Sequence, residues 1–151
     1  MSLHIPKTII DECLANRPVG GKNILEPLQS LTKERGISIN ILEDTQVTNK
    51  VEVHVYESDI WYCLEGEAKF LIGGDMVDQY DRIKSDGTVD TQELRAKGLK
   101  NAKEVILKPG DWLWIPAGEP HQHGAEGTAR MVIIKIPTPL PVIPVKNARP
   151  Y

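Results

Sequence analysis

Apolar and polar residues alternate along most of the chain with the two-residue period of half-buried β-strands. In Ile37–Leu42 the isoleucines fall at every second position, and in Val51–Tyr56 valines alternate with Glu52, His54 and Tyr56. Further strand-length runs are predicted at Ile60–Leu64, Ala68–Ile72, Glu104–Leu107, Asp111–Ile115 and Ala129–Ile136. Glycine or proline turns separate them at Gly66, Gly73–Gly74, Pro109–Gly110 and Gly124–Gly127. Many short strands with this punctuation predict an all-β sandwich or barrel.

Two segments depart from the strand pattern. Residues 3–15 have apolar positions at helical spacing, which predicts one short amphipathic helix near the N-terminus. The interval Asp75–Lys103 is long, polar and charged, and it is interpreted either as a lid or interface segment or as a plain surface insertion. Within it, Gln92–Leu99 is compatible with a helical turn, because Glu93 and Lys97 stand at the i,i+4 spacing that favours pairing.

The tail after Ile136 contains five prolines, which exclude a helix or a central strand and predict an extended arm. Its apolar residues indicate that the arm lies against the chain's own barrel or against a partner subunit. Trp112 and Trp114, at alternate positions of a predicted strand, are expected in the core or in an apolar pocket wall.

Composition narrows the classes of function. The 151 residues suit one domain, and the hydrophobic and charged fractions of 40% and 26% are those of an ordinary globular protein. The net charge of -3 leaves no basic stripe for nucleic acid, and no run of apolar residues is long enough to span a bilayer. Cys13 and Cys63 are interpreted as small buried hydrophobes in a reducing compartment. With no apolar leader near the N-terminus, a cytoplasmic location is expected.

Candidate chemistry lies in two stretches, Val51–Gly66 and Pro109–Gly124, that are far apart in the sequence. Together they supply Glu52, His54 and Asp59 from the first stretch and His121 from the second. Because residues two apart on a strand share a face, Glu52 and His54 point the same way. Nitrogen and carboxylate donors of this kind suit one divalent metal ion, with Zn, Mn, Fe or Ni as candidates.

Four further side chains are predicted around the metal. His123 and Tyr56 are the candidates for proton transfer, and His123 is interpreted as a pocket-wall residue rather than a direct ligand. Trp61 and Cys63 share a face with Asp59 and are therefore expected to line the pocket.

These residues follow two spaced motifs. Gly110, Pro116, Gly118 and His121 match G-x5-P-x-G-x2-H-x3-N, with Ala125 in place of the asparagine. Asp59 stands six residues before Gly66, so in G-x5-H-x-H-x3,4-E-x6-G it takes the glutamate position, His54 the second histidine and Glu52 the first. Gln46 stands where the opening glycine belongs. A register with His54 first and Tyr56 second leaves only two residues before Asp59 and fits worse. With these motifs the chain resembles the cupin superfamily, in particular small single-domain bacterial cupins.

The resemblance implies a double-stranded β-helix barrel of the jelly-roll type, with the short N-terminal helix and the proline-rich arm added. It implies one domain over residues 1–151, with a core barrel at about 37–136 and an arm at 137–151, and a homodimer. It implies a metal site that binds a small molecule. Two histidines with two carboxylates bring the first shell around a divalent ion to neutrality, so we expect it to attract anions less than three histidines and one glutamate would. If Glu52 does not bind, the set becomes two histidines and one carboxylate, as in non-haem iron oxygenases.

The cupin fold hosts many reactions, so the activity is left as alternatives. The first is a metalloenzyme acting on a small oxygen-rich metabolite, such as a sugar acid, a keto acid or an enol, by isomerase, lyase or dioxygenase chemistry. The second is a non-catalytic module that binds or senses such a metabolite. The third is a structural protein with a vestigial pocket.

Overall fold

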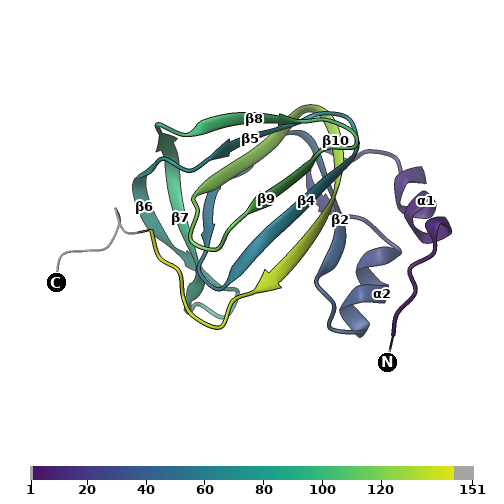
Figure 1. The fold of residues 1–151 in the computed structure, drawn as a ribbon, viewed down its shortest axis with the longest axis horizontal. Coiled ribbons are helices and arrows are strands. Elements are labelled where there is room, and N and C mark those ends of the chain that lie inside the picture. Colours follow the sequence, from purple (N-terminus) through teal and green to yellow (C-terminus); the bar gives the residue numbers. More distant parts are fainter. Residues whose placement is uncertain (1, 145–151) are drawn as a thin grey trace.

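The computed structural model describes residues 2–144 of the chain, which form two helices and ten strands (Figure 1). The helices are α1 (Lys7–Ala15) and α2 (Leu28–Glu34). The strands are β1 (Gly21–Ile24), β2 (Ile39–Thr48), β3 (Val51–His54), β4 (Glu57–Glu65), β5 (Ala68–Ile72), β6 (Asp75–Ile83), β7 (Val89–Lys100), β8 (Lys103–Leu107), β9 (Trp112–Ile115) and β10 (His121–Pro137). Neither described helix has the length and apolarity needed to cross a lipid bilayer.

The long strand β10 joins two antiparallel layers. Its first residues pair with β3 and β5, and its later residues pair with β2 and β4. The layers therefore run β6-β7-β3-β10-β5-β8 and β1-β2-β10-β4-β9, and β1, β6, β8 and β9 are edge strands among the described residues. The predicted all-β, double-layered fold is confirmed, although the hydrogen-bonded ladder does not close into a ring.

The main core lies between the two layers and follows from the alternation of the strands. Trp61 and Cys63 of β4, Phe70 of β5 and Met131 of β10 are fully or almost fully buried in one cluster. On the other side of β3, Val51 and Val53 pack in a separate cluster with Met76 and Ala96 of the β6–β7 hairpin. Strand β3 is thus covered on both faces, so the charged face that carries Glu52 and His54 is enclosed.

The segment from Asp75 to Lys103 is not a helical loop. It forms the antiparallel pair β6–β7 (Figure 1), and β7 pairs with β3 over Val51–His54. The prediction of a helical turn at Gln92–Leu99 is wrong because consecutive residues of β7 pair with β3 on one side and with β6 on the other. Glu93 binds Arg82 and Arg95 instead of Lys97. The predicted turn at Gly124–Gly127 is also wrong, since those residues form a bulge inside β10.

The prediction that Trp112 and Trp114 of β9 lie in the core or in a pocket wall is wrong. Trp112 and Trp114 are exposed over 65% and 63% of their surface, and Tyr62 contacts the Trp112 ring at a centroid distance of 4.5 Å. The residues of β9 do alternate between two faces, but Leu113 and Ile115 are the ones that point inward and pack on the core.

Both ends of the described chain pack on the β-structure. The predicted N-terminal helix is confirmed over Lys7–Ala15, and Cys13 packs with α2 against Ile41 of β2. The helix α2 and the strand β1 were not predicted. The arm lies against the chain's own fold: Val142 N–H donates to Val55 C=O at 2.8 Å, and its side chain fills the space that a Cβ at Gly118 would need. Residues 145–151 of the predicted arm lie outside the described residues.

One buried arginine ties the N-terminal segment to the β-structure. Arg130 of β10 is 3% exposed, and its Nε donates to Glu43 Oε2 at 2.8 Å. Its two terminal nitrogens donate to the carbonyls of Leu14 and Asn16, where α1 ends.

Replacement Arg130→Met is expected to lower the free energy of unfolding by about 3 kcal/mol, because it leaves the Glu43 carboxylate buried without its partner. Urea denaturation measures the change. Arg35→Met, at the exposed end of α2, is the control and should change the value by less than about 0.5 kcal/mol. Equal midpoints for the two variants would show that the Arg130 contacts contribute nothing net.

Candidate metal centre

The register between β3 and β10 creates the centre of the site. His121 of β10 pairs directly with Glu52 of β3, and His54 lies two residues from Glu52 on the same face. One donor atom from each of these three residues lies within 4.8 Å of the other two. His54 Nε2 and His121 Nε2 stand 3.7 and 3.6 Å from the same oxygen of Glu52, Oε1.

Asp59 of β4 adds a second carboxylate. Its Oδ2 lies 3.5 Å from His54 Nε2 and 3.6 Å from His121 Nε2, and its side chain is 1% exposed. All four residues that the sequence predicted as metal donors therefore meet at one place, although they come from three strands.

Several atoms of this group have no hydrogen-bond partner. His121 Nδ1 is 3.0 Å from the Glu119 carbonyl, which accepts its proton and turns Nε2 toward the carboxylates of Glu52 and Asp59. His121 Nε2 and Asp59 Oδ2 are both buried and unpartnered within the described residues. Buried polar atoms of native proteins are nearly always satisfied, so these two indicate a missing partner of positive charge. The donor set therefore fits a divalent cation.

Glu52 is ionised at neutral pH in spite of its burial. Burial raises the pKa of its carboxyl group, but the nearby imidazoles of His121 and His54 and the positive charge of Lys22 more than offset this effect. The pKa of Glu52 is consequently held well below its usual range. An anionic oxygen is thus available at the site without the cost of deprotonation.

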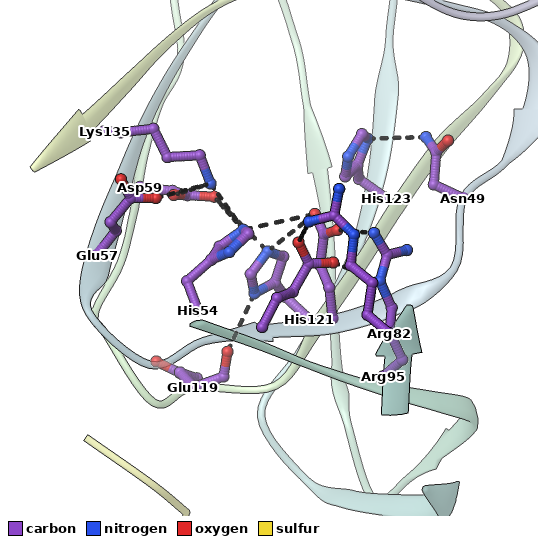
Figure 2. Close-up of polar contacts among 12 residues, drawn as sticks. Asn49, His54, Glu57, Asp59, Arg82, Arg95, Glu119, His121, His123 and Lys135 are labelled. Atoms are coloured by element: carbon purple, nitrogen blue, oxygen red, sulfur yellow. Dashed lines mark hydrogen bonds and ion pairs between the residues drawn. The ribbon is translucent and has the colours of Figure 1, made fainter. Parts of the chain in front are cut away.

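Lys135 of β10 is a member of the group that the sequence analysis missed (Figure 2). Its Nζ donates to Asp59 Oδ1 at 2.8 Å and to His54 Nε2 at 2.7 Å. The signal was present in the sequence, because Lys135 is a single charge inside the apolar run MVIIKIP. Pairing of Lys135 with Asp59 across β10 and β4 places the ammonium group at the edge of the donor cluster.

A cavity of about 280 Å³ opens beside the cluster. Its wall includes both donors of β3, the indole of Trp61 and four cationic side chains; the full lining is Lys22, Ile24, Ser38, Asn40, Leu42, Glu52, His54, Trp61, Arg82, Glu93, Arg95, Ile133 and Lys135. Figure 2 shows Lys135 and Asp59 on one side of the two histidines and Arg82 and Arg95 on the other. The prediction that Trp61 lines a pocket therefore agrees with the cavity's position.

His123 lies apart from the metal donors, beside Asn49 (Figure 2). Its Nδ1 is 2.6 Å from Asp44 Oδ2, and its ring contacts Trp61 at a centroid distance of 4.9 Å. Burial lowers the pKa of His123, although Asp44 acts in the opposite direction. The ring is therefore neutral at pH 7, with its proton on the nitrogen that faces Asp44 and a buried lone pair on Nε2.

Two other predicted pocket residues lie elsewhere. Tyr56 was expected on the face of Glu52 and His54, but β3 ends at His54 and the chain bends, which leaves Tyr56 37% exposed. Cys63 was expected beside Trp61 in the pocket wall. It lies farther along β4 in the hydrophobic core, where its thiol contacts the carbonyls of Glu65 and Gly66.

Gln46, which stands where the first motif has its opening glycine, has a backbone conformation that is typical of glycine. Gln46 has φ of +49°, in the left-handed region that L-residues seldom adopt. It stands opposite the bulge of β10, where Thr45 pairs with Thr128 and Val47 with Ala125. This conformation supports the register in which Glu52 takes the first histidine position.

Solved structures of several proteins are similar to this fold. A sugar phosphate isomerase from a cupin superfamily, from Silicibacter pomeroyi, has 17% identity over 79% of this chain and 61% of its own, with a TM-score of 0.48. The cupin domain of Drosophila melanogaster CENP-C has 10% identity over 69% and 59%, with a TM-score of 0.46. An oxalate oxidase has 18% identity over 82% and 55%, with a TM-score of 0.48. No protein-family model and no curated protein matches the sequence.

The described strands form a two-layered antiparallel fold. The identities of 18% or below and the TM-scores below 0.5 carry no inference from these proteins to the reaction of this chain. The chemistry of this chain must therefore be argued from its own side chains.

The depressed pKa of Glu52 gives stability a specific dependence on pH. Its contribution is complete above the ordinary pKa of 4.5 and is lost as the pH falls toward the lower pKa of the folded state. Between pH 4.5 and pH 3 the free energy of unfolding of Glu52→Gln should thus fall less steeply than that of the unsubstituted protein. Denaturant titrations at several pH values measure both slopes, with Glu126→Gln as an exposed control. Parallel slopes for Glu52→Gln and the unsubstituted protein would contradict the assignment.

Proposed function

We propose that this protein is a metal-dependent cupin that acts on a small oxygen-rich metabolite, such as a sugar acid, a keto acid or an enol. Isomerase, lyase and dioxygenase reactions are the candidate chemistries. One observation carries the proposal: His121 Nε2 and Asp59 Oδ2, both buried and without a hydrogen-bond partner among residues 2–144, stand 3.6 Å apart beside Glu52 and His54. In this proposal Glu52, His54, Asp59 and His121 hold one divalent ion.

The bound ion would supply a Lewis acid that polarises substrate oxygens. The chain itself supplies the surroundings. Trp61 forms an apolar wall that orients a ligand, and the enclosed position of Asp59 and His121 excludes bulk water from the donors. Proton transfer by His123 requires a ligand atom or a water molecule next to Trp61, since the His123 ring contacts Trp61 but does not itself line this cavity among the described residues.

A second function, capture of a metabolite without turnover, is favoured by one observation. Tyr56 and His123, the two side chains predicted to transfer protons, are absent from the described residues that line the cavity. A thermal shift caused by a metabolite that is recovered unchanged would support this alternative, whereas formation of product would support the enzyme. The homodimer, the cytoplasmic location and the lack of nucleic-acid partners stay predictions from the sequence.

The metal proposal predicts that His54→Ala and His121→Ala each weaken binding of a divalent ion by at least about tenfold. Protein purified without a chelator is assayed by elemental analysis, and zinc affinity is measured by competition with a chromogenic chelator. The control is His4→Ala, since His4 is exposed near the N-terminus. Metal content in both site variants equal to that of the control would contradict the proposal.

Replacement of Lys135 is expected to change the affinity for a divalent ion in the opposite direction. Its ammonium group occupies the lone pair of His54 Nε2, which a metal ion would need, and it adds a positive charge beside the ion. Replacement Lys135→Met is therefore expected to tighten zinc binding about tenfold. Lys69→Met removes the same charge from an exposed pair with Glu104 and should leave the affinity unchanged. Weaker zinc binding in Lys135→Met would mean that the lysine supports the donor cluster instead of competing with the ion.

A further inference from the structure

The charges around the cavity are arranged for a ligand that is itself negative. Four cations, Lys22, Arg82, Arg95 and Lys135, are present in its wall. Within the described residues, Arg82 and Arg95 pair with Glu93, Asp90 and Glu52, and Lys135 pairs with Asp59 and Glu57. These five carboxylates outnumber the four cations by one, so a divalent ion at the donor cluster would leave one positive charge uncompensated.

Lys22 of β1 is the one of these four cations that makes no hydrogen bond or ion pair with the described residues, although its charge acts on Glu52 at longer range. A second cavity of about 510 Å³ adjoins the first and shares Lys22, Glu52, Arg82 and Arg95 with it. The lysine therefore borders both cavities.

Arg95 of β7 also lines both cavities, and ion pairs hold the orientation of its side chain. Its Nε binds Glu93, and Nη2 lies 3.5 Å from Glu52 Oε2, beyond a good hydrogen bond. Glu93 also accepts from Arg82 at 2.5 Å, so one buried carboxylate holds both guanidinium groups. An arginine held in this way keeps terminal N–H donors in the fork geometry that matches a carboxylate or phosphate group.

The indole N–H of Trp61 in the cavity wall requires a hydrogen-bond acceptor instead of an anion. Trp61 is 1% exposed, lines the cavity, and its Nε1–H has no acceptor within the described residues. A buried indole N–H normally finds an acceptor, so the ligand is expected to bring an oxygen to this depth. The volume of about 280 Å³ admits a small metabolite and no polymer.

From this arrangement we propose that the ligand is a small organic anion, whose carboxylate or phosphate group binds between Lys22 and Arg95 while a second oxygen reaches Trp61. The inference rests on the proposed function for the identity of the site and narrows its substrate class to anions. It also revises the expectation from the donor set alone, because the cations that attract the anion lie outside the metal donors.

The test is run on metal-free protein and on zinc-loaded protein, so that the contributions of the protein cations and of the metal to anion binding are measured separately. Inorganic phosphate, malonate and the neutral polyol xylitol are titrated at low ionic strength, and the dissociation constants come from backbone amide shifts in NMR spectra. We expect phosphate, malonate or both to bind, with shifts at β1 and β7, and xylitol to bind at least tenfold more weakly. A response to phosphate alone assigns a phosphorylated ligand, and a response to malonate assigns a carboxylate.

Lys22→Met breaks no internal ion pair and should raise the dissociation constant of the bound anion about fivefold, the effect of losing one charged contact. Arg95→Lys keeps the charge beside Glu52 and Glu93 but loses the fork, and it should raise the constant by a similar factor. Lys33→Met on the exposed surface of α2 is the control.

Equal anion affinities in Lys22→Met, Arg95→Lys and the control, or binding of xylitol as tight as that of the anions, would overturn the inference. A failure of the metal proposal is distinct, because it appears as missing metal in the histidine assays and leaves the anion titrations of the metal-free protein unaffected.

Discussion

The candidate site depends on one point of strand register, the pairing of His121 with Glu52 between β10 and β3. Directly opposed residues of antiparallel strands have Cβ atoms about 5 Å apart, which is within the span of two ligands of one ion. A shift by a single residue would turn His121 to the other face of the sheet. The corner at Pro116, Gly118 and Pro120 precedes His121, and Gly118 N–H donates to the His54 carbonyl at 2.9 Å, which fixes the start of β10 against β3.

The electrostatic design of the site is layered. The donor residues come from β3, β4 and β10, in the interior of the fold, and are mostly buried. Around them lie partly exposed cations from β1, β6, β7 and β10, of which Arg82 and Arg95 are held by a second set of carboxylates, Asp90 and Glu93. Burial makes each unpaired charge expensive, and this explains why nearly every charged group of the inner wall has an opposite partner.

Sequence reasoning succeeded where short-range rules decide the geometry. Two local patterns predicted the fold and the convergence of the metal donors: the spacing of Glu52 and His54 on one strand, and the spacing of Gly110 to His121. Both are informative because strand alternation and rigid turns depend on nearby residues. Sequence reasoning failed where distant strands decide which way a side chain points or which segment a strand pairs with. The bend after His54 removes Tyr56 from the donor face, and β7 became a strand because it pairs with β3. Lys22 and Arg95 reach the cavity only through the three-dimensional arrangement of β1 and β7, which no local pattern encodes.

The β6–β7 hairpin separates two tasks within this molecule. Arg82, Glu93 and Arg95 all belong to it, whereas none of the four candidate metal donors does. Substitutions in the hairpin can therefore alter the charge around the cavity while the candidate metal donors stay unchanged. Such a division offers evolution a route to new ligand selectivity on one set of donors, through a pair of strands at the edge of the sheet.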